Sequence, residues 1–261
     1  MEKRAYKLIL VEARAGVCTL TLNRPERRNA IGAVMANELL YALDDAHVDT
    51  DVRCVVLTGA GQAFCAGGDF SQMTGQGDAD ALPPKGDYKD LLLALLNTTK
   101  PVLARVNGHA MGGGLGLVAA STFAVASSEA KLGTPEINVG LFPYMIMAVL
   151  ERLVGRRRLT EMFLSGERMS AAQAAELQLV NRAVPPEQLD AAVAEYTRMI
   201  CDKSPKSIEL GLRAMRETEG LTLEQKLPLL SQRLLETLAT EDAQEGLMAF
   251  LQKREPRWKG R

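Results

Sequence analysis

The sequence predicts an α/β fold with a helical region at its C-terminal end. Apolar strand-like runs alternate with helical segments, which is typical of an α/β core with right-handed crossovers. Two of these runs end in glycine-rich turns, at residues 66–68 and 112–114, and the second turn leads directly into a helix. From Ser204 onward the apolar residues keep helical spacing. We therefore expect a core over residues 1–200 and a helical region over residues 201–261.

The first half of the chain begins with a hairpin over residues 7–22, which turns at Arg14-Ala15-Gly16. A polar loop follows, then a helix near 33–47 and a buried strand at Cys54–Leu57. The glycine turn at 66–68 should open a short helix that Asp69 caps. The remaining expected elements are a loop at 74–87 rich in Gly, Asp and Pro, a leucine-rich helix near 88–98, and a strand over 101–106.

The second half begins at the glycine turn 112–114 and its helix, followed by short strands at 123–126 and 131–133. Ser170 and Gln173 form a capping box for a helix over 171–177. A strand over 179–184 follows, and Pro185-Pro186 opens the next helix. Ser204 and Pro205 start one further helix, and the capping box of Thr222 with Gln225 starts another. In the last helix, Gly246, Leu247 and Phe250 share one face.

The composition excludes several classes of function. With 47% hydrophobic residues, 24% charged residues and a net charge of −1, the chain has no electrostatic basis for binding nucleic acid or an anionic membrane. Four scattered cysteines and two histidines make a zinc site hard to assemble, so no metal is expected. The N-terminus has no signal-peptide pattern and no stretch is apolar enough to span a membrane. The expected location is cytoplasmic.

The stretch from Asn107 to Gly116 organises the chain. It runs from a strand through Gly112-Gly113-Gly114 into a helix, so the backbone can approach a ligand closely. The first N–H groups of a helix have no partner inside it and attract negative charge. Taken alone, the triplet could also be close helix packing or a degenerate dinucleotide turn, but its mid-chain position argues against the latter. We expect it to hold a charge that develops during a reaction.

Three motifs together resemble the crotonase family, also called the enoyl-CoA hydratase/isomerase superfamily. They are Phe64-Cys65-Ala66-Gly67-Gly68-Asp69, Asn107–Gly114 and Gly133-Thr134-Pro135-Glu136, with supporting matches at Leu22–Pro25, Asn29-Ala30 and Phe250–Arg254. The resemblance covers essentially the whole chain in the family's order. It implies a crotonase-like spiral of ββα repeats with C-terminal helices that drive trimer formation, and either a homotrimer or a hexamer of two trimers.

The resemblance also implies the chemistry. An acyl-CoA thioester would form an enolate whose oxygen is held by the backbone N–H groups of Ala66 and Gly113. Glu136 would be the general acid and base, with a pKa raised by an apolar pocket. No cofactor is implied, since CoA arrives as part of the substrate. The residues expected to contact substrate are Gly67, Gly68, Asp69, Gly112, Arg28, Phe250 and Lys253.

Several of these assignments have a structural alternative. Arg28 could contact CoA phosphates or be solvated. In the family, residues at the positions of Phe250 and Lys253 reach CoA, often from a neighbouring subunit, but Phe250 could instead be a core residue of the last helix. His109 is expected to be a structural histidine beside the pocket. The loop at 74–87 is either a gate over the pocket or an idle insertion.

The sequence departs from the family pattern at two places. Two-glutamate hydratases have a second glutamate two residues after the Gly-Gly-Gly run, where this chain has Gly116, and Tyr144-Met145-Ile146-Met147 replaces the usual glycines after Pro143. The expected activity is an enoyl-CoA hydratase with a single glutamate. The alternatives are a Δ3,Δ2-enoyl-CoA isomerase, which needs only one carboxylate, and a non-catalytic acyl-CoA-binding scaffold, against which the retention of Glu136 argues.

Overall fold

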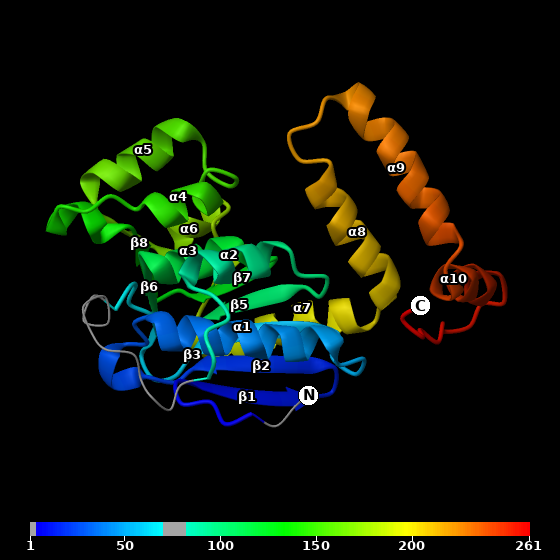
Figure 1. Cartoon of the computed structure of the whole chain (residues 1–261), viewed down its shortest axis with the longest axis horizontal. Coiled ribbons are helices and arrows are strands. Elements are labelled where there is room, and N and C mark those ends of the chain that lie inside the picture. Colours follow the sequence, from blue (N-terminus) through cyan, green and yellow to red (C-terminus); the bar gives the residue numbers. More distant parts are fainter. Residues whose placement is uncertain (1–3, 70–81) are drawn as a thin grey trace.

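The computed structural model describes residues 4–69 and 82–261, and within them the strands form two sheets (Figure 1). The larger sheet contains, in spatial order, β1 (Ile9–Arg14), β2 (Val17–Leu22), β3 (Cys54–Gly59), β5 (Val102–Val106), β7 (Phe123–Ser127) and β10 (Arg182–Val184). The smaller sheet contains β4 (Ala63–Cys65), β6 (His109–Met111), β8 (Lys131–Gly133) and β9 (Arg168–Ser170). Strand pairs are parallel except for β1 with β2 and β8 with β9. This confirms the predicted α/β class.

Helices connect and cover these strands. They are α1 (Ala33–Val48), α2 (Tyr88–Leu96), α3 (Gly113–Ala120), α4 (Tyr144–Leu150), α5 (Arg156–Ser165), α6 (Ala171–Glu176), α7 (Leu189–Cys201), α8 (Pro205–Glu217), α9 (Leu223–Leu238) and α10 (Glu241–Leu251). The predicted capping boxes at Ser170 and Thr222 and the cap at Ser204 are confirmed. The hairpin also turns where expected, with Ala15 and Gly16 at φ of 50° and 83°.

The central strands β3 and β5 of the larger sheet are buried on both faces. On β3, Val55 and Leu57 face the cluster that includes α1, α2 and α3, whereas Val56 faces the cluster that includes α7. Leu103 of β5 joins Val56 on the α7 side. Because successive side chains of a strand point to opposite faces, a strand covered on both sides must be apolar throughout. This explains the continuous apolar runs that identified these strands in the sequence.

Five local predictions need correction or comment. The strand β6 lies inside the stretch taken as a turn, and β9 was not predicted. Each has three residues and forms through pairing with strands distant in the sequence, β6 with β4 and β8, and β9 with β8. The strand predicted to start at 179 starts at Arg182, since residues 179–180 belong to the preceding turn. The short helix after Gly68 and most of the 74–87 loop lie outside the described residues.

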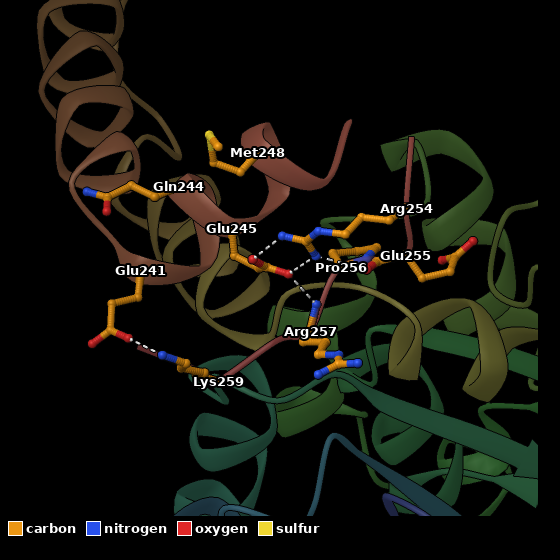
Figure 2. A pocket seen from close by; sticks show the side chains of 9 residues that line it. All are labelled: Glu241, Gln244, Glu245, Met248, Arg254, Glu255, Pro256, Arg257 and Lys259. Carbon is orange, nitrogen blue, oxygen red and sulfur yellow. Dashed lines mark hydrogen bonds and ion pairs between the residues drawn. The ribbon is translucent and has the colours of Figure 1, made fainter. Parts of the chain in front are cut away.

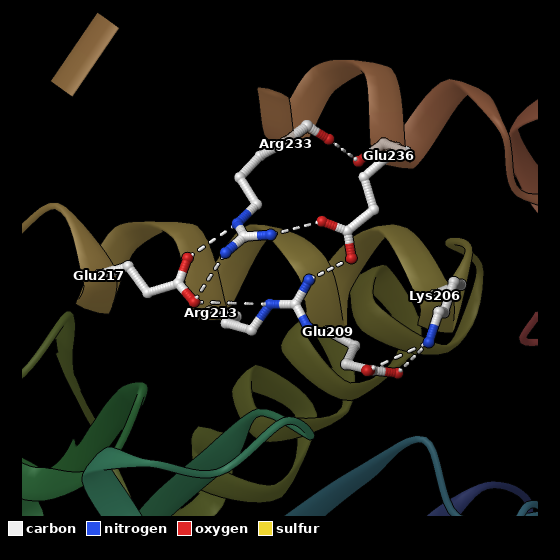
Figure 3. Close-up of polar contacts among 7 residues, drawn as sticks. Lys206, Glu209, Arg213, Glu217, Arg233 and Glu236 are labelled. Atoms are coloured by element: carbon white, nitrogen blue, oxygen red, sulfur yellow. Dashed lines mark hydrogen bonds and ion pairs between the residues drawn. The ribbon is translucent and has the colours of Figure 1, made fainter. Parts of the chain in front are cut away.

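The C-terminal helices α8, α9 and α10 extend to one side of the sheets (Figure 1). Helices α8 and α9 are joined by ion pairs in which Arg213 and Arg233 each contact Glu217 and Glu236 (Figure 3). The outer surface of this region is apolar, with exposed side chains at Leu223, Leu227, Leu230, Leu234, Leu235, Leu238, Leu247 and Leu251. Exposed apolar surface of this extent is typical of surfaces that bind another molecule. In the described part of the chain, none of the helices has the length and apolarity needed to cross a membrane.

Candidate active site

Three sequence motifs meet at one edge of the smaller sheet. Strands β4, β6 and β8 are parallel neighbours, so the residues that follow them emerge at the same edge. Those residues are the glycine turn 66–68, the glycine turn 112–114, and Thr134-Pro135-Glu136. Ligand sites of open α/β sheets lie at the carboxyl ends of parallel strands. The motifs that carried the resemblance are therefore adjacent in space.

The glycines are required by close contacts between these turns. A Cβ on Gly67, which has a φ of +105°, would lie 3.1 Å from the carbonyl oxygen of Met111. A Cβ on Gly112, at φ +49°, would lie 2.6 Å from Oε1 of Glu136. The Gly112 N–H donates to the carbonyl of Gly133 at 2.9 Å, which ties the second glycine turn to the Pro-Glu turn. No L side chain fits these backbone conformations without strain.

Two asparagines hold β4 and its turn in place. Asn29 is fully buried, accepts from Arg24 N–H at 2.9 Å, and donates to the carbonyls of Ala60 and Ala63 at 2.9 and 2.8 Å. Asn107 accepts from Gly59 N–H at 3.0 Å and donates to the carbonyl of Gly61 at 3.0 Å. Neither was assigned this role from the sequence. Their signal was their position inside the quoted motifs, Asn29-Ala30 and Asn107-Gly108.

The backbone donors at the site differ from the prediction at one position. The N–H of Ala66 donates to the carbonyl of Arg28 at 2.9 Å, so it is already occupied. Within the described ranges, the N–H groups of Gly68 and Gly113 have no acceptor, and a Cβ on Gly68 would meet no atom within 4 Å. Gly113 is the first residue of α3, where N–H groups have no partner within the helix. The hydrogen bond to Arg28 contradicts the prediction that Ala66 N–H is free to hold an oxyanion.

Glu136 lies in the first turn of the short 3₁₀ helix Pro135–Val139. Its carboxyl group faces Gly112, and its buried Oε2 has no hydrogen-bond partner in the part of the chain that the structure describes. Burial raises the pKa of this carboxyl above the ordinary glutamate value, and a hydrogen bond with its own backbone offsets part of the rise. A half-buried carboxyl with an unpartnered oxygen is suited to exchange protons with a bound molecule.

The polar residues around the first glycine turn have structural partners. Asp69 forms an ion pair with Arg24, and its N–H donates to the carbonyl of Ile31 at 2.8 Å. Arg28 is exposed, at a φ of 51°, and its carbonyl accepts a hydrogen bond from the Ala66 N–H of the turn. His109 accepts a hydrogen bond from Lys131 N–H at 3.1 Å, as expected of a structural histidine. Asp69 and Arg28 as substrate contacts remain predictions.

The position of the absent second carboxylate is filled by other side chains. A Cβ on Gly116 would overlap Oη of Tyr88 and would lie 2.5 Å from Cγ2 of Ile146. Tyr88 opens α2, and its hydroxyl donates to the carbonyl of Gly113 at 2.6 Å. Of the bulky residues after Pro143, Ile146 is buried here, whereas Tyr144 is 67% exposed. Sequence reasoning missed Tyr88, whose only signal was its place directly after the capping residue Asp87.

The two substrate contacts predicted near the C-terminus are not part of the site around Glu136. Phe250 is on α10 and Lys253 follows it, on the side of the chain opposite β6 and β8 (Figure 1). Phe250 is 81% exposed, which contradicts the alternative that it is a core residue. Near it, α10 and the chain end line a cavity of about 770 Å³ crossed by the Arg254–Glu245 ion pair (Figure 2). None of the glycine-turn residues lines this cavity, so it is separate from the site around Glu136.

Comparisons with known proteins show what the whole chain is similar to. Residues 12–261 match the family described as enoyl-CoA hydratase/isomerase. A probable enoyl-CoA hydratase of Rhizobium meliloti is 36% identical over 98% of this chain and 100% of its own. The 2,3-dehydroadipyl-CoA hydratase of Escherichia coli is 34% identical, over 97% and 99%. Among solved structures, an enoyl-CoA hydratase of Mycobacterium smegmatis superposes with a TM-score of 0.88 at 34% identity, covering 97% of this chain and 99% of that one.

Proposed function

Because the chain belongs to the enoyl-CoA hydratase/isomerase family, we propose that it is an enoyl-CoA hydratase. It would add water across the C2=C3 double bond of a 2-enoyl thioester of coenzyme A. The observation that carries the proposal is the buried, unpartnered Glu136 oxygen beside the glycine turn that begins α3. A proton-transfer group and free backbone donors on adjacent strands are what this reaction requires.

The thioester oxygen would be held by the N–H groups of Gly68 and Gly113. Attack of water at C3 moves electron density onto this oxygen, and donors aimed at the developing charge stabilise the transition state. Both N–H groups are without an acceptor in the described structure, whereas that of Ala66 is occupied by Arg28. Loss of one such donor typically costs about 3 kcal/mol of transition-state stabilisation. Since these donors are backbone groups, the turns need small residues and not particular side chains.

Glu136 would act on both sides of the reaction. As a carboxylate it takes a proton from the attacking water, and as the resulting acid it delivers that proton to C2 of the enolate. The water oxygen forms its bond to C3, so the product is a 3-hydroxyacyl-CoA. Burial of Glu136 raises its pKa, which brings its two protonation states closer in free energy near neutral pH.

A Δ3,Δ2-enoyl-CoA isomerase is the second candidate. It is favoured by one observation, that the side-chain space above Gly116 is closed to a second carboxylate. An isomerase needs only one group to move a proton between two carbons, and Glu136 could do this. A non-catalytic acyl-CoA-binding scaffold is a third possibility, against which the preserved position of Glu136 argues.

One set of assays separates these three functions. The purified protein is given a 2-enoyl-CoA, and the loss of the absorbance of the conjugated thioester is followed. It is then given a 3-enoyl-CoA, and the gain of the same absorbance is followed. Hydration of the first substrate supports the proposal, and activity on the second alone supports the isomerase. If Glu136→Gln keeps full activity on the substrate that reacts, the assignment of Glu136 is wrong.

We further propose that the substrate is an acyl-CoA, with no metal or redox cofactor, and that the protein is a homotrimer or a dimer of trimers. The exposed leucines of α9 and α10 would be covered by neighbouring copies. The exposure of Phe250 fits this arrangement, because Phe250 and Lys253 would then reach CoA in a neighbouring subunit. Sedimentation or light scattering at several concentrations measures the assembly, and a monomer at all of them would contradict it.

A further inference from the structure

Tyr88 occupies the place that a second carboxylate would need. Its hydroxyl donates to the Gly113 carbonyl at 2.6 Å, and a Cβ on Gly116 would overlap the same oxygen. Ile146 closes the remaining side of this space, with its Cγ2 2.5 Å from that Cβ position. No side chain at residue 116 could point into the site unless both neighbours moved. The polar group available at this point is therefore a phenol.

The Tyr88 hydroxyl and the Glu136 carboxyl both lie against the glycine-rich start of α3. Glu136 lies against Gly112 and Tyr88 lies against Gly116, and these two glycines are joined by a helical hydrogen bond from Gly116 N–H to the Gly112 carbonyl at 3.0 Å. Gly112 is the residue before the first residue of α3, so both side chains lie at the start of the same helix. The charge of Glu136 contributes to the rise of the Tyr88 pKa, which places the two groups near each other.

The phenol of Tyr88 has a defined role in hydrogen bonding. Burial, and then the nearby Cys65 and Glu136, raise its pKa well above the ordinary tyrosine value, so the hydroxyl keeps its proton. That proton is donated to the Gly113 carbonyl. The oxygen keeps its capacity to accept a hydrogen bond from water. Glu136, with its unpartnered Oε2, is the matching acceptor on the other side.

We propose, on the premise of the hydratase function above, that Tyr88 Oη and the Glu136 carboxylate hold the reacting water between them. One hydrogen of the water goes to Glu136 and then to C2, while the water oxygen bonds to C3. The second hydrogen, which Tyr88 Oη accepts as a hydrogen bond, stays on the new hydroxyl group. Tyr88 neither gains nor loses a proton. It is thus a catalytic residue for hydration that takes the place of the absent second carboxylate.

The test compares a reaction that needs the water with one that does not. In Tyr88→Phe the ring stays and the hydroxyl is lost, so kcat for hydration of a 2-enoyl-CoA should fall about tenfold, the size of one hydrogen bond, with little change in KM. Exchange of the α-proton of a saturated acyl-CoA in D₂O, followed by mass spectrometry, uses Glu136 and the backbone donors without the attacking water. That exchange should stay within about twofold of wild type.

Two further variants control the experiment. Tyr41→Phe also removes a tyrosine hydroxyl that donates to a backbone carbonyl, that of Pro83 at 3.2 Å, and it should leave both reactions unchanged. Gly116→Ala adds the Cβ that overlaps Tyr88 Oη, and it should give the same selective loss of hydration as Tyr88→Phe.

The outcomes separate this proposal from the function on which it rests. A wild-type protein that hydrates no 2-enoyl-CoA overturns the proposed function, and the role of Tyr88 with it. A wild type that hydrates while Tyr88→Phe keeps its kcat overturns the role of Tyr88 alone. An equal loss of hydration and exchange in Tyr88→Phe also overturns it, because Tyr88 would then act by supporting the Gly113 turn.

Discussion

Replacing Gly112 by alanine tests whether the glycine turn positions the catalytic carboxyl group. Gly112 has a φ of +49° and ψ of −120°, a conformation that L residues rarely adopt. Its added Cβ would lie 2.6 Å from Glu136 Oε1, about 0.8 Å closer than an ordinary contact of about 3.4 Å. The carboxyl group must therefore move by roughly that amount or the turn must rearrange.

Both consequences have a size that can be estimated. Backbone strain at such a position costs about 1–3 kcal/mol, which should lower the melting temperature. A displacement of about 1 Å at a catalytic group can cost about 100-fold in rate. We expect kcat for hydration to fall by about that factor, with a smaller effect on KM, since Glu136 acts mainly in the chemical step.

The matched control is Gly211→Ala on α8. A Cβ on Gly211 would meet no atom within 4 Å, and this glycine does not have a positive φ. The same substitution should therefore stabilise the helix by about 0.5–1 kcal/mol and leave kcat unchanged. Thermal unfolding and steady-state kinetics on both variants measure these effects. If Gly112→Ala keeps wild-type kcat, the contact with Glu136 does not position the carboxyl group and the reasoning fails.

Three other predictions concern the pH profile, the fold and the assembly. Burial raises the pKa of Glu136, and hydration needs its carboxylate form. As the pH is lowered, kcat/KM should therefore fall around a pH above the ordinary glutamate pKa of about 4.3. A fall that occurs only at or below that pH would contradict the assignment of Glu136 as the base. Asn29→Ala removes three hydrogen bonds, with Arg24, Ala60 and Ala63, so the free energy of unfolding should fall by about 3 kcal/mol in denaturant titrations. A loss under about 1 kcal/mol would show that the segment from Ala60 to β4 is held by other contacts. Phe250→Ala should raise KM for an acyl-CoA with kcat unchanged, because the expected contact is with the CoA end of the substrate; an unaltered KM would leave Phe250 with a role in assembly only.

Much of the fold could be predicted from local patterns. The hairpin turn, the helix caps at Ser170, Ser204 and Thr222, and the strands of the larger sheet follow from interactions within a few residues or from apolar runs buried on both faces. The three-residue strands β6 and β9 were missed, although β8, of the same length, was predicted at residues 131–133. They exist through pairing with β8, which is more than 20 residues from β6 and more than 30 from β9.

Some parts of the candidate site could likewise be predicted from the sequence, and others could not. Glu136 and the residues of the glycine turns were assigned from their match to the family's motifs, and the structure brings these motifs together at the ends of β4, β6 and β8. The assignment of Ala66 failed because the availability of an N–H depends on its acceptor, and that acceptor is the carbonyl of Arg28, distant in the sequence.

By itself, the sequence determined the α/β class, the family, the two glycine turns and the single glutamate. Only the tertiary structure decided which N–H groups are free and what fills the space above Gly116. The hydroxyl of Tyr88 arrives there on α2 and bonds Gly113, 25 residues later in the chain. The physical reason is that the backbone conformation of a turn follows from its own residues. Whether an N–H group has an acceptor, and whether a volume is filled by side chains, depends on every segment packed around it.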